Sequence, residues 1–123
     1  MKTRQDTKKK KRYALHSKFH PETGKRATVG GVLIGEELRF GIAICSPRDQ
    51  FRRKTGFNKA TGRAEMDPTK NDVLDRDGDY QGPLYKVTVS DIKEAGKIFG
   101  DIARKFLDEK GFPYKTYNQP IEA

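Results

Sequence analysis

The first third of the chain alternates apolar and polar residues, which is the pattern of strands that bury one face. The alternation runs through residues 13–20, and residues 21–24, Pro-Glu-Thr-Gly, then supply a turn. The return arm, residues 25–34, gathers Val, Leu and Ile around Gly30 and Gly31. We therefore expect a hairpin with a bulge or tight bend at the two glycines.

A third strand is predicted over residues 38–45, where the alternation is clear. Its large apolar side chains share one face, namely Leu38, Phe40, Ile42 and Ile44. The opposite face carries Arg39 and three small residues, namely Gly41, Ala43 and Cys45. We expect another element to pack closely against this small-residue face.

The signals for a helix start follow directly. Ser46 can cap free backbone amides, Pro47 suits the first helical position, and Asp49 faces the positive end of the helix dipole. The sequence therefore predicts a helix over residues 47–64, weakened by two internal glycines and open to a break at Gly56.

The last third of the chain predicts a strand and the clearest helix. Residues 84–89 alternate again, and Ser90 can cap a helix that ends at Gly111. Apolar residues recur along this helix at the spacing of one buried face, namely Ile92, Ala95, Phe99, Ile102, Ala103, Phe106 and Leu107. The fold class is α+β in the order β-β-β-α-β-α: an antiparallel sheet of about four strands with two helices on at least one face.

Composition limits the core of this fold. Only 33% of the 123 residues are apolar and 35% are charged, so we expect one lean domain over residues 13–112. Residues 1–12 end in a run of cations with nothing to bury, which predicts a disordered basic N-terminal arm. Residues 113–123 are expected to form a C-terminal tail. Residues 67–79 hold five Asp residues and predict an acidic surface loop.

The charge of the chain points to an anionic partner. The 26 Lys and Arg against 17 Asp and Glu give a formal net charge of +9 at pH 7. This excess suits a nucleic acid, an anionic surface or an acidic protein. The single cysteine, Cys45, excludes an internal disulfide, and no apolar run is long enough to cross a bilayer. We expect a cytoplasmic protein without a membrane partner.

The strongest candidate site lies on the helix predicted over residues 47–64. At 100° per residue, four cations fall at about 0°, 20°, 40° and 60° around its axis, namely Arg48, Lys59, Arg52 and Arg63. Like charges four residues apart destabilise an isolated helix, and a bound anion would offset that cost. The alternative is a solvated face on a basic protein.

Two further basic segments could contact phosphates without reading sequence. The arm contributes Lys8, Lys9, Lys10, Lys11 and Arg12, and the predicted hairpin tip contributes Lys25 and Arg26. A solvating tail and an ordinary basic turn are the alternatives. Aromatic residues could stack on bases, and the candidates are Phe51, Phe57, Tyr80, Tyr85, Tyr114 and Tyr117. Of these, Phe51 and Phe57 more readily anchor the predicted helix to the sheet.

Catalytic and metal-binding patterns are sparse. His16 and His20 share a face of the predicted strand but lie about 13 Å apart, too far to bind one metal ion directly. Cys45 is more readily a buried apolar residue than a nucleophile. Residues 75–79, Asp-Arg-Asp-Gly-Asp, alternate like a calcium loop, but the glycine is fourth instead of sixth and the twelfth position is Lys86. We expect no cofactor, no metal and no enzyme activity.

Residues 40–64, FGIAICSPRDQFRRKTGFNKATGRA, resemble a strand-to-helix segment of small bacteriophage-type proteins. The resemblance covers about a fifth of the chain. It implies a small viral accessory protein that acts on host or viral macromolecules or signals, in the cytoplasm of the host. Some phage anti-defence proteins, including Thoeris-inhibiting sponges, are small oligomers that sequester signalling nucleotides. A basic helix at a subunit interface would suit that task, although the resemblance assigns no individual site residue.

These observations leave three functional hypotheses. The first is an accessory protein that binds nucleic acid through backbone phosphates, using the arm and the cationic stripe. The second is a homo-oligomeric sponge that holds a signalling nucleotide in a basic, inter-subunit pocket. The third is an inhibitor that docks on an acidic host protein.

Overall fold

A computed structural model describes residues 11–65, 83–114 and 121–122 of the chain. Its strands are β2 (Lys11–His16), β3 (Arg26–Ile34), β4 (Glu37–Cys45), β5 (Pro83–Thr88) and β6 (Ile121–Glu122). Its helices are α1 (Arg53–Ala64), the short 3-10 helix η2 (Ile92–Glu94) and α2 (Ala95–Lys110). The predicted α+β class and the order β-β-β-α-β-α are confirmed, and β6 is a two-residue addition.

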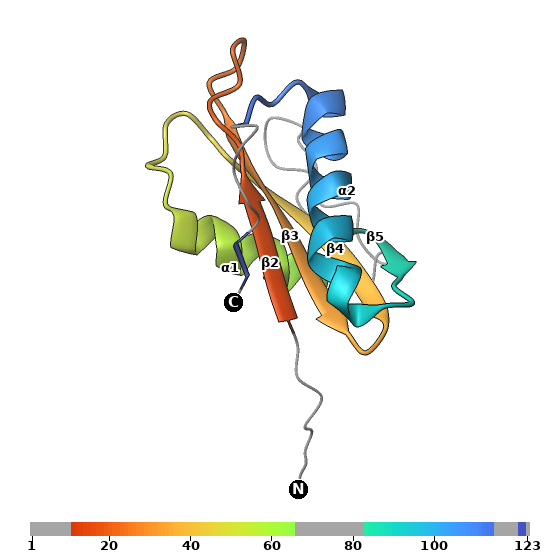
Figure 1. Cartoon of the computed structure of the whole chain (residues 1–123). Helices are drawn as coiled ribbons and strands as arrows, with labels where there is room; N and C mark the ends of the chain where they lie inside the picture. The colour runs from red at the N-terminus through yellow and green to blue at the C-terminus, as the bar shows by residue number, and fades with distance from the viewer. Residues whose placement is uncertain (1–10, 66–82, 115–120, 123) are drawn as a thin grey trace, which may run out of the picture.

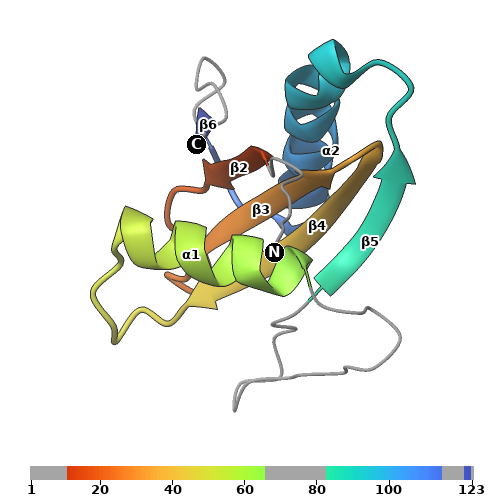
Figure 2. The ribbon, with the colours of Figure 1, turned by 90° about the horizontal axis from the view of Figure 1, so that it is seen from below.

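The five strands form one antiparallel sheet in the order β5-β4-β3-β2-β6. α1 and α2 lie on opposite faces of this sheet, as Figures 1 and 2 show. The sheet is therefore the middle of three layers, and its central strands are covered on both sides. Among the described residues, no helix is both long enough and apolar enough to span a membrane.

Large side chains fill the space between the sheet and α2. Phe99 of α2 is fully buried, and its ring stacks on Tyr13 and on Phe40 at centroid distances of 5.5 and 5.7 Å. Tyr13, Gly31 and Phe40 are neighbours in register on three strands, and a Cβ at Gly31 would lie 2.5 Å from the Phe99 ring. The Phe99 ring therefore packs on Gly31, which leaves room for it because it has no side chain. The predicted apolar faces of β4 and α2 both point into this core.

The opposite face of the sheet carries small residues where α1 crosses it. Ala14, Gly30 and Gly41 are neighbours in register on β2, β3 and β4. Ala60 of α1 is fully buried, and a Cβ at Gly30 would lie 2.6 Å from its backbone carbonyl carbon. Backbone therefore packs directly on backbone. The close packing predicted for the small-residue face of β4 is confirmed.

The bulge or bend predicted at Gly30 and Gly31 is wrong. β3 continues through both glycines, with unbroken pairing to β2 and β4. One glycine faces α1 and the other faces Phe99, and neither position has room for a Cβ. These residues are glycine because of close packing on both faces and not because the strand bends.

α1 begins at Arg53, six residues later than the predicted start at Pro47. The Ser46 hydroxyl accepts a hydrogen bond from the Arg48 amide at 3.2 Å, which belongs to a local turn. The Ser46 hydroxyl thus makes the amide contact predicted of a cap, but only one turn follows, closed by a hydrogen bond from the Asp49 amide to the Ser46 carbonyl at 3.0 Å. The chain then continues as a loop through residue 52. The helix is continuous through Gly56, and no break occurs there.

α2 begins through a 3-10 turn, and its cap differs from the prediction. The capping residue is Asp91 instead of Ser90, and its carboxylate accepts a hydrogen bond from the Lys93 amide at 3.0 Å. Ile92 is 50% exposed, so the buried stripe starts later than predicted, at Ala95. Gly111 ends the helix in the left-handed conformation with φ 78°, as its position predicts.

Both ends of the predicted domain shift. β2 begins at Lys11, so Lys11 and Arg12 belong to the sheet and not to an arm. Ile121 and Glu122, inside the predicted tail, pair with β2 as strand β6. Backbone groups at a sheet edge can pair with any extended segment, and side-chain patterns do not report this. Outside the described residues lie Lys8, Lys9, Lys10, the acidic loop 67–79, Tyr80 and Tyr117.

Candidate functional site

Tertiary packing brings three basic segments to one end of the sheet. They are the turn between β2 and β3, the loop of residues 46–52 and the first half of α1. The turn and the loop are in contact, because a Cβ at Gly24 would lie 3.3 Å from the Cβ of Pro47. We call this surface the basic end. Its cations are Lys18 and Lys25 of the turn, Arg26 directly after the turn, Arg48 and Arg52 of the loop, and Arg53, Lys54 and Lys59 of α1.

Arg26 connects the hairpin to the loop. Its guanidinium carbon lies 4.1 Å from the ring centroid of Phe51 and 5.0 Å from that of Phe19. Its Nε donates a hydrogen bond to the Ser17 carbonyl at 3.2 Å. The Phe51 ring in turn meets the edge of the His16 ring at a centroid distance of 5.4 Å. Arg26 therefore fixes the arrangement of the basic end while its charge adds to the local positive potential.

Five cations of the loop and of α1 are exposed, and none has an ion pair within the described part of the chain: Arg48, Arg52, Arg53, Lys54 and Lys59. The acidic residues within the three segments are Glu22 and Asp49. The first turn of α1 contains no acidic residue, and no side chain caps its start. The positive end of the helix dipole therefore adds to the charge of these side chains.

The four-cation stripe predicted from the sequence does not form. Because α1 begins at Arg53, Arg48 lies in the preceding turn and Arg52 is the N-cap residue. Arg63 turns toward the sheet and donates a hydrogen bond to the Ile42 carbonyl at 3.1 Å. Burial lowers the pKa of Arg63. Arg63 is therefore placed at the contact between α1 and β4, away from the exposed basic surface.

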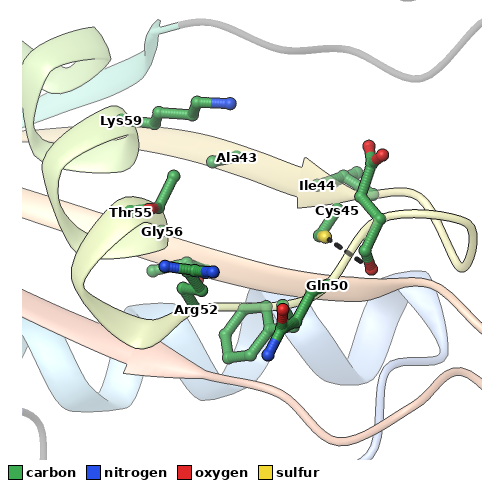
Figure 3. A pocket seen from close by; sticks show the side chains of 11 residues that line it. Ala43, Ile44, Cys45, Gln50, Arg52, Thr55, Gly56 and Lys59 are labelled. Atoms are coloured by element: carbon green, nitrogen blue, oxygen red, sulfur yellow. Dashed lines mark hydrogen bonds between the residues drawn. The ribbon is translucent and has the colours of Figure 1, made fainter.

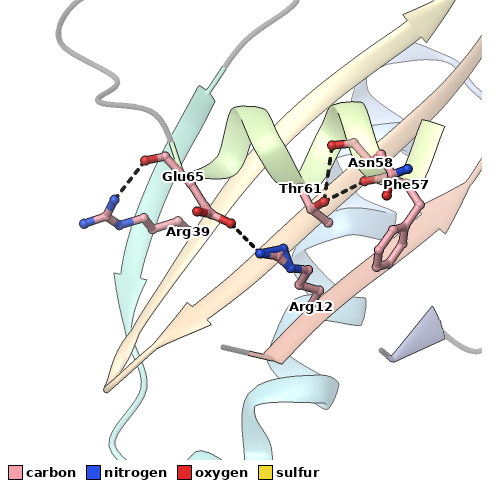
Figure 4. Close-up of polar contacts among 6 residues, drawn as sticks. All are labelled: Arg12, Arg39, Phe57, Asn58, Thr61 and Glu65. Atoms are coloured by element: carbon pink, nitrogen blue, oxygen red, sulfur yellow. Dashed lines mark hydrogen bonds and ion pairs between the residues drawn. The ribbon is translucent and has the colours of Figure 1, made fainter. Parts of the chain in front are cut away.

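Cations at the other end of α1 are paired, as Figure 4 shows for Arg12 and Arg39. The Glu65 carboxylate lies 3.0 Å from Arg12, and the Glu65 carbonyl accepts a hydrogen bond from Arg39 at 3.2 Å. Glu37 lies 2.6 Å from Arg39 and 3.5 Å from Lys86, and the hydrogen bond from Arg39 lowers the pKa of Glu37. Arg12, predicted as part of a nucleic-acid-binding arm, is thus engaged within the fold.

A hollow of about 190 Å³ opens between the end of β4, the loop and α1 (Figure 3). Arg52, Thr55 and Lys59 line it from the helix side, and Cys45 lines it from β4. Burial raises the pKa of Cys45, so its thiol stays protonated at neutral pH and is a poor nucleophile. Ligand pockets usually measure roughly 300 to 1,000 Å³, so this hollow has room for a phosphate-sized group but not for a whole nucleotide.

His16 lies buried beneath α1. Its Nδ1 is 2.8 Å from the Thr28 hydroxyl oxygen, and its buried Nε2 has no hydrogen-bond partner among the described residues. Burial, together with the charges of Arg53 and Arg26, lowers the pKa of His16 to about 4. The ring is therefore neutral at pH 7, and protonating it opposes folding.

The two histidines do not share a strand face. β2 ends at His16, and His20 lies at the turn, where its Nδ1 accepts a hydrogen bond from the Glu22 amide at 3.1 Å. Within the described ranges, no group of three or more His, Cys, Asp or Glu residues could hold a metal ion.

Sequence reasoning missed Arg53, Lys54 and Phe19 as parts of this surface. The two cations fall outside the predicted stripe because they lie at about 140° and 240° on the same helical wheel. Phe19 falls within the strand predicted over residues 13–20, yet it is 62% exposed because β2 ends at His16. Pro21 lies in the predicted turn and ends the predicted strand only at residue 20, so no local signal marks the earlier end at His16.

No protein-family model, curated protein or solved structure matches the chain. The segment 40–64 does form a strand followed by a helix, β4 and α1. Its resemblance to small bacteriophage-type proteins gains no support from these comparisons. We therefore base the functional proposal on the basic end.

Proposed function

We propose that this protein binds nucleic acid through backbone phosphates at the basic end. The observation that carries the proposal is the set of five exposed cations without an ion pair in the described residues. Cations at the other end of α1 are neutralised by Glu37 and Glu65. Unneutralised like charges repel one another, and a bound polyanion removes that repulsion.

The basic end suits a string of phosphates better than one compact ligand. Its cations come from a turn, a loop and a helix, and Lys25 and Arg26 extend the surface beyond the predicted helix. Flexible Lys and Arg side chains contact phosphates without reading bases, and each contact releases counterions. The affinity should therefore fall steeply with salt and depend little on sequence.

Fluorescence anisotropy with a dye-labelled oligonucleotide across a salt series tests this proposal. Arg52→Gln with Lys59→Gln removes two exposed cations of the basic end, and Lys97→Gln with Lys105→Gln removes two exposed cations of α2 as the matched control. We expect the first pair to weaken binding well beyond the control and to reduce the salt slope by about one unit per lost contact. Equal affinities of the two double variants would overturn the proposal.

A small phosphorylated ligand in the hollow is the second candidate. Arg52, Thr55 and Lys59 line the hollow, which gives a phosphate two cations and a hydroxyl. The volume of about 190 Å³ leaves the rest of a nucleotide outside, which favours the extended polyanion. Calorimetric titration with a mononucleotide would distinguish the two, because a small ligand in the hollow would bind with only a shallow salt dependence.

A further inference from the structure

Phe19 is a large aromatic side chain held outside the core. Its exposed fraction is 62%, and it lies between the end of β2 and the hairpin turn. The backbone on both sides is fixed, because the Lys18 amide donates to the Pro113 carbonyl at 2.7 Å and the His20 amide donates to the Lys25 carbonyl at 2.8 Å. A hydrogen-bonded backbone therefore presents this ring to solvent.

Arg26 orients the Phe19 ring from one side. The guanidinium carbon lies over the ring at 5.0 Å from its centroid, and the same guanidinium lies 4.1 Å from the centroid of Phe51. The hydrogen bond from Arg26 to Ser17 holds the guanidinium in place. Phe19 thus has one face on a fixed cation, while the rest of its surface remains open.

Two cations lie beside this exposed ring. Lys18 precedes Phe19 in the chain, and the Arg26 guanidinium lies against the ring. The hairpin turn contacts the loop that carries Arg48 and Arg52. An exposed aromatic ring with cations beside it complements a base with its attached phosphate. A duplex hides the faces of its bases within the stack, so only an unpaired base can use such a surface.

We infer that Phe19 stacks on an unpaired base, so that the nucleic acid bound at the basic end is single-stranded there. This inference rests on the proposed phosphate binding and adds the strand state of the ligand. Stacking uses the π-face that every base has, so base identity should matter little. Loss of one stacked base corresponds to about a ten-fold loss of affinity.

The test compares three labelled probes of equal length: oligo(dT), a duplex, and a single strand of abasic sites. Phe19→Ala in the full chain should bind oligo(dT) about ten-fold more weakly and bind the duplex and the abasic strand as the parent does. Ile92→Ala is the matched control, because Ile92 is the other exposed large apolar residue in the described part of the chain, at 50%, and lies at the start of η2. The control should leave all three affinities unchanged.

Phe19→Trp supplies a direct readout, because the chain contains no tryptophan. We expect this variant to keep its affinity for oligo(dT), since an indole stacks at least as well as a phenyl ring. Its fluorescence should be quenched by oligo(dT) and remain unchanged with the abasic strand. Quenching of equal size by both probes would contradict stacking.

The outcomes separate this inference from the proposed function. Unchanged oligo(dT) binding by Phe19→Ala, together with weaker binding by Arg52→Gln with Lys59→Gln, would overturn stacking and leave phosphate binding in place. Equal losses for oligo(dT) and the duplex would also overturn it, as would a change in oligomer mass of Phe19→Ala on native mass spectrometry. A parent protein that binds neither probe at low salt would overturn both proposals.

Discussion

The two faces of the sheet are packed by opposite means. Against α2 the sheet presents large rings, and Phe99 stacks on Tyr13 and Phe40. Against α1 it presents small residues, and the helix backbone meets the strand backbone at Gly30. The α2 face buries apolar area, whereas the α1 face buries the polar ring of His16 and carries the exposed cations of the basic end.

Because of this difference, the large buried side chains that stabilise the fold and the cations proposed to bind nucleic acid are different sets of residues. Apolar burial against α2 supplies a large share of the driving force for folding, because it removes the most apolar area from water. The cations of the basic end are exposed, so removing them leaves no cavity. Substitutions in the core against α2 should therefore lower stability strongly. Substitutions of the exposed cations should change stability little and weaken binding.

The largest stability effect is expected for Phe99→Ala. The substitution removes a ring that is fully buried between α2 and the sheet and leaves a cavity over Gly31. We expect a loss of about 3 to 5 kcal/mol in the free energy of unfolding, measured by denaturant titration. Phe106→Ala is the graded control, because Phe106 is only partly buried and should cost less. A loss below about 1 kcal/mol for Phe99→Ala would contradict the assigned core.

Gly30→Ala tests the opposite face. The added Cβ would lie 2.6 Å from the backbone of α1, so the helix must move away from the sheet. We expect a loss of about 2 to 3 kcal/mol by the same titration. Gly62→Ala on the same helix is the matched control, because a Cβ there meets no atom within 4 Å. The control should gain up to about 1 kcal/mol from helix propensity, and a similar gain for Gly30→Ala would refute backbone contact.

His16 makes stability depend on pH. Its pKa is about 4 in the folded protein against an ordinary value of 6.5. As the pH falls below 6.5 the unfolded chain binds the proton first, so stability is lost from there down to about pH 4. The loss between pH 6.5 and 5 should be about 2 kcal/mol.

The measurement is urea unfolding at pH 7, 6 and 5 for the parent and for His16→Asn. The asparagine is neutral throughout this range, so the variant should show a flatter profile even though its stability is lower at every pH. Parallel profiles for the two proteins would show that His16 is not the group responsible.

The smallest effects on stability are expected for two residues of the predicted stripe, Arg63 and Arg52, which should differ in their effect on binding. Arg63→Gln should cost about 1 to 2 kcal/mol, because it loses the hydrogen bond to the Ile42 carbonyl, and should leave oligonucleotide affinity unchanged. Arg52→Gln should keep stability within about 0.5 kcal/mol and lower the affinity. Thermal melts and anisotropy on the same samples check both. Weaker oligonucleotide binding by Arg63→Gln, with unchanged stability, would instead support the four-cation stripe.

Local patterns predicted the elements whose large apolar side chains share one face. The alternation of β4 and the helical spacing of α2 both matched the structure, because each reflects contact with a single core. The same reasoning failed at residues 46–52, where Ser46 bonds the Arg48 amide in a local turn that does not continue as a helix. It failed again at Phe19, because apolar alternation continued past the end of β2.

The sequence by itself determined the α+β order, the apolar faces of β4 and α2, and the excess of positive charge. These properties follow from composition and from the spacing of apolar residues that are close in the sequence. Only the tertiary structure decided that the helices cover opposite faces, that α1 starts at Arg53, and which cations remain unpaired. Those features depend on contacts between distant segments, such as Glu65 with Arg12 and Gly24 with Pro47, and no local pattern encodes them.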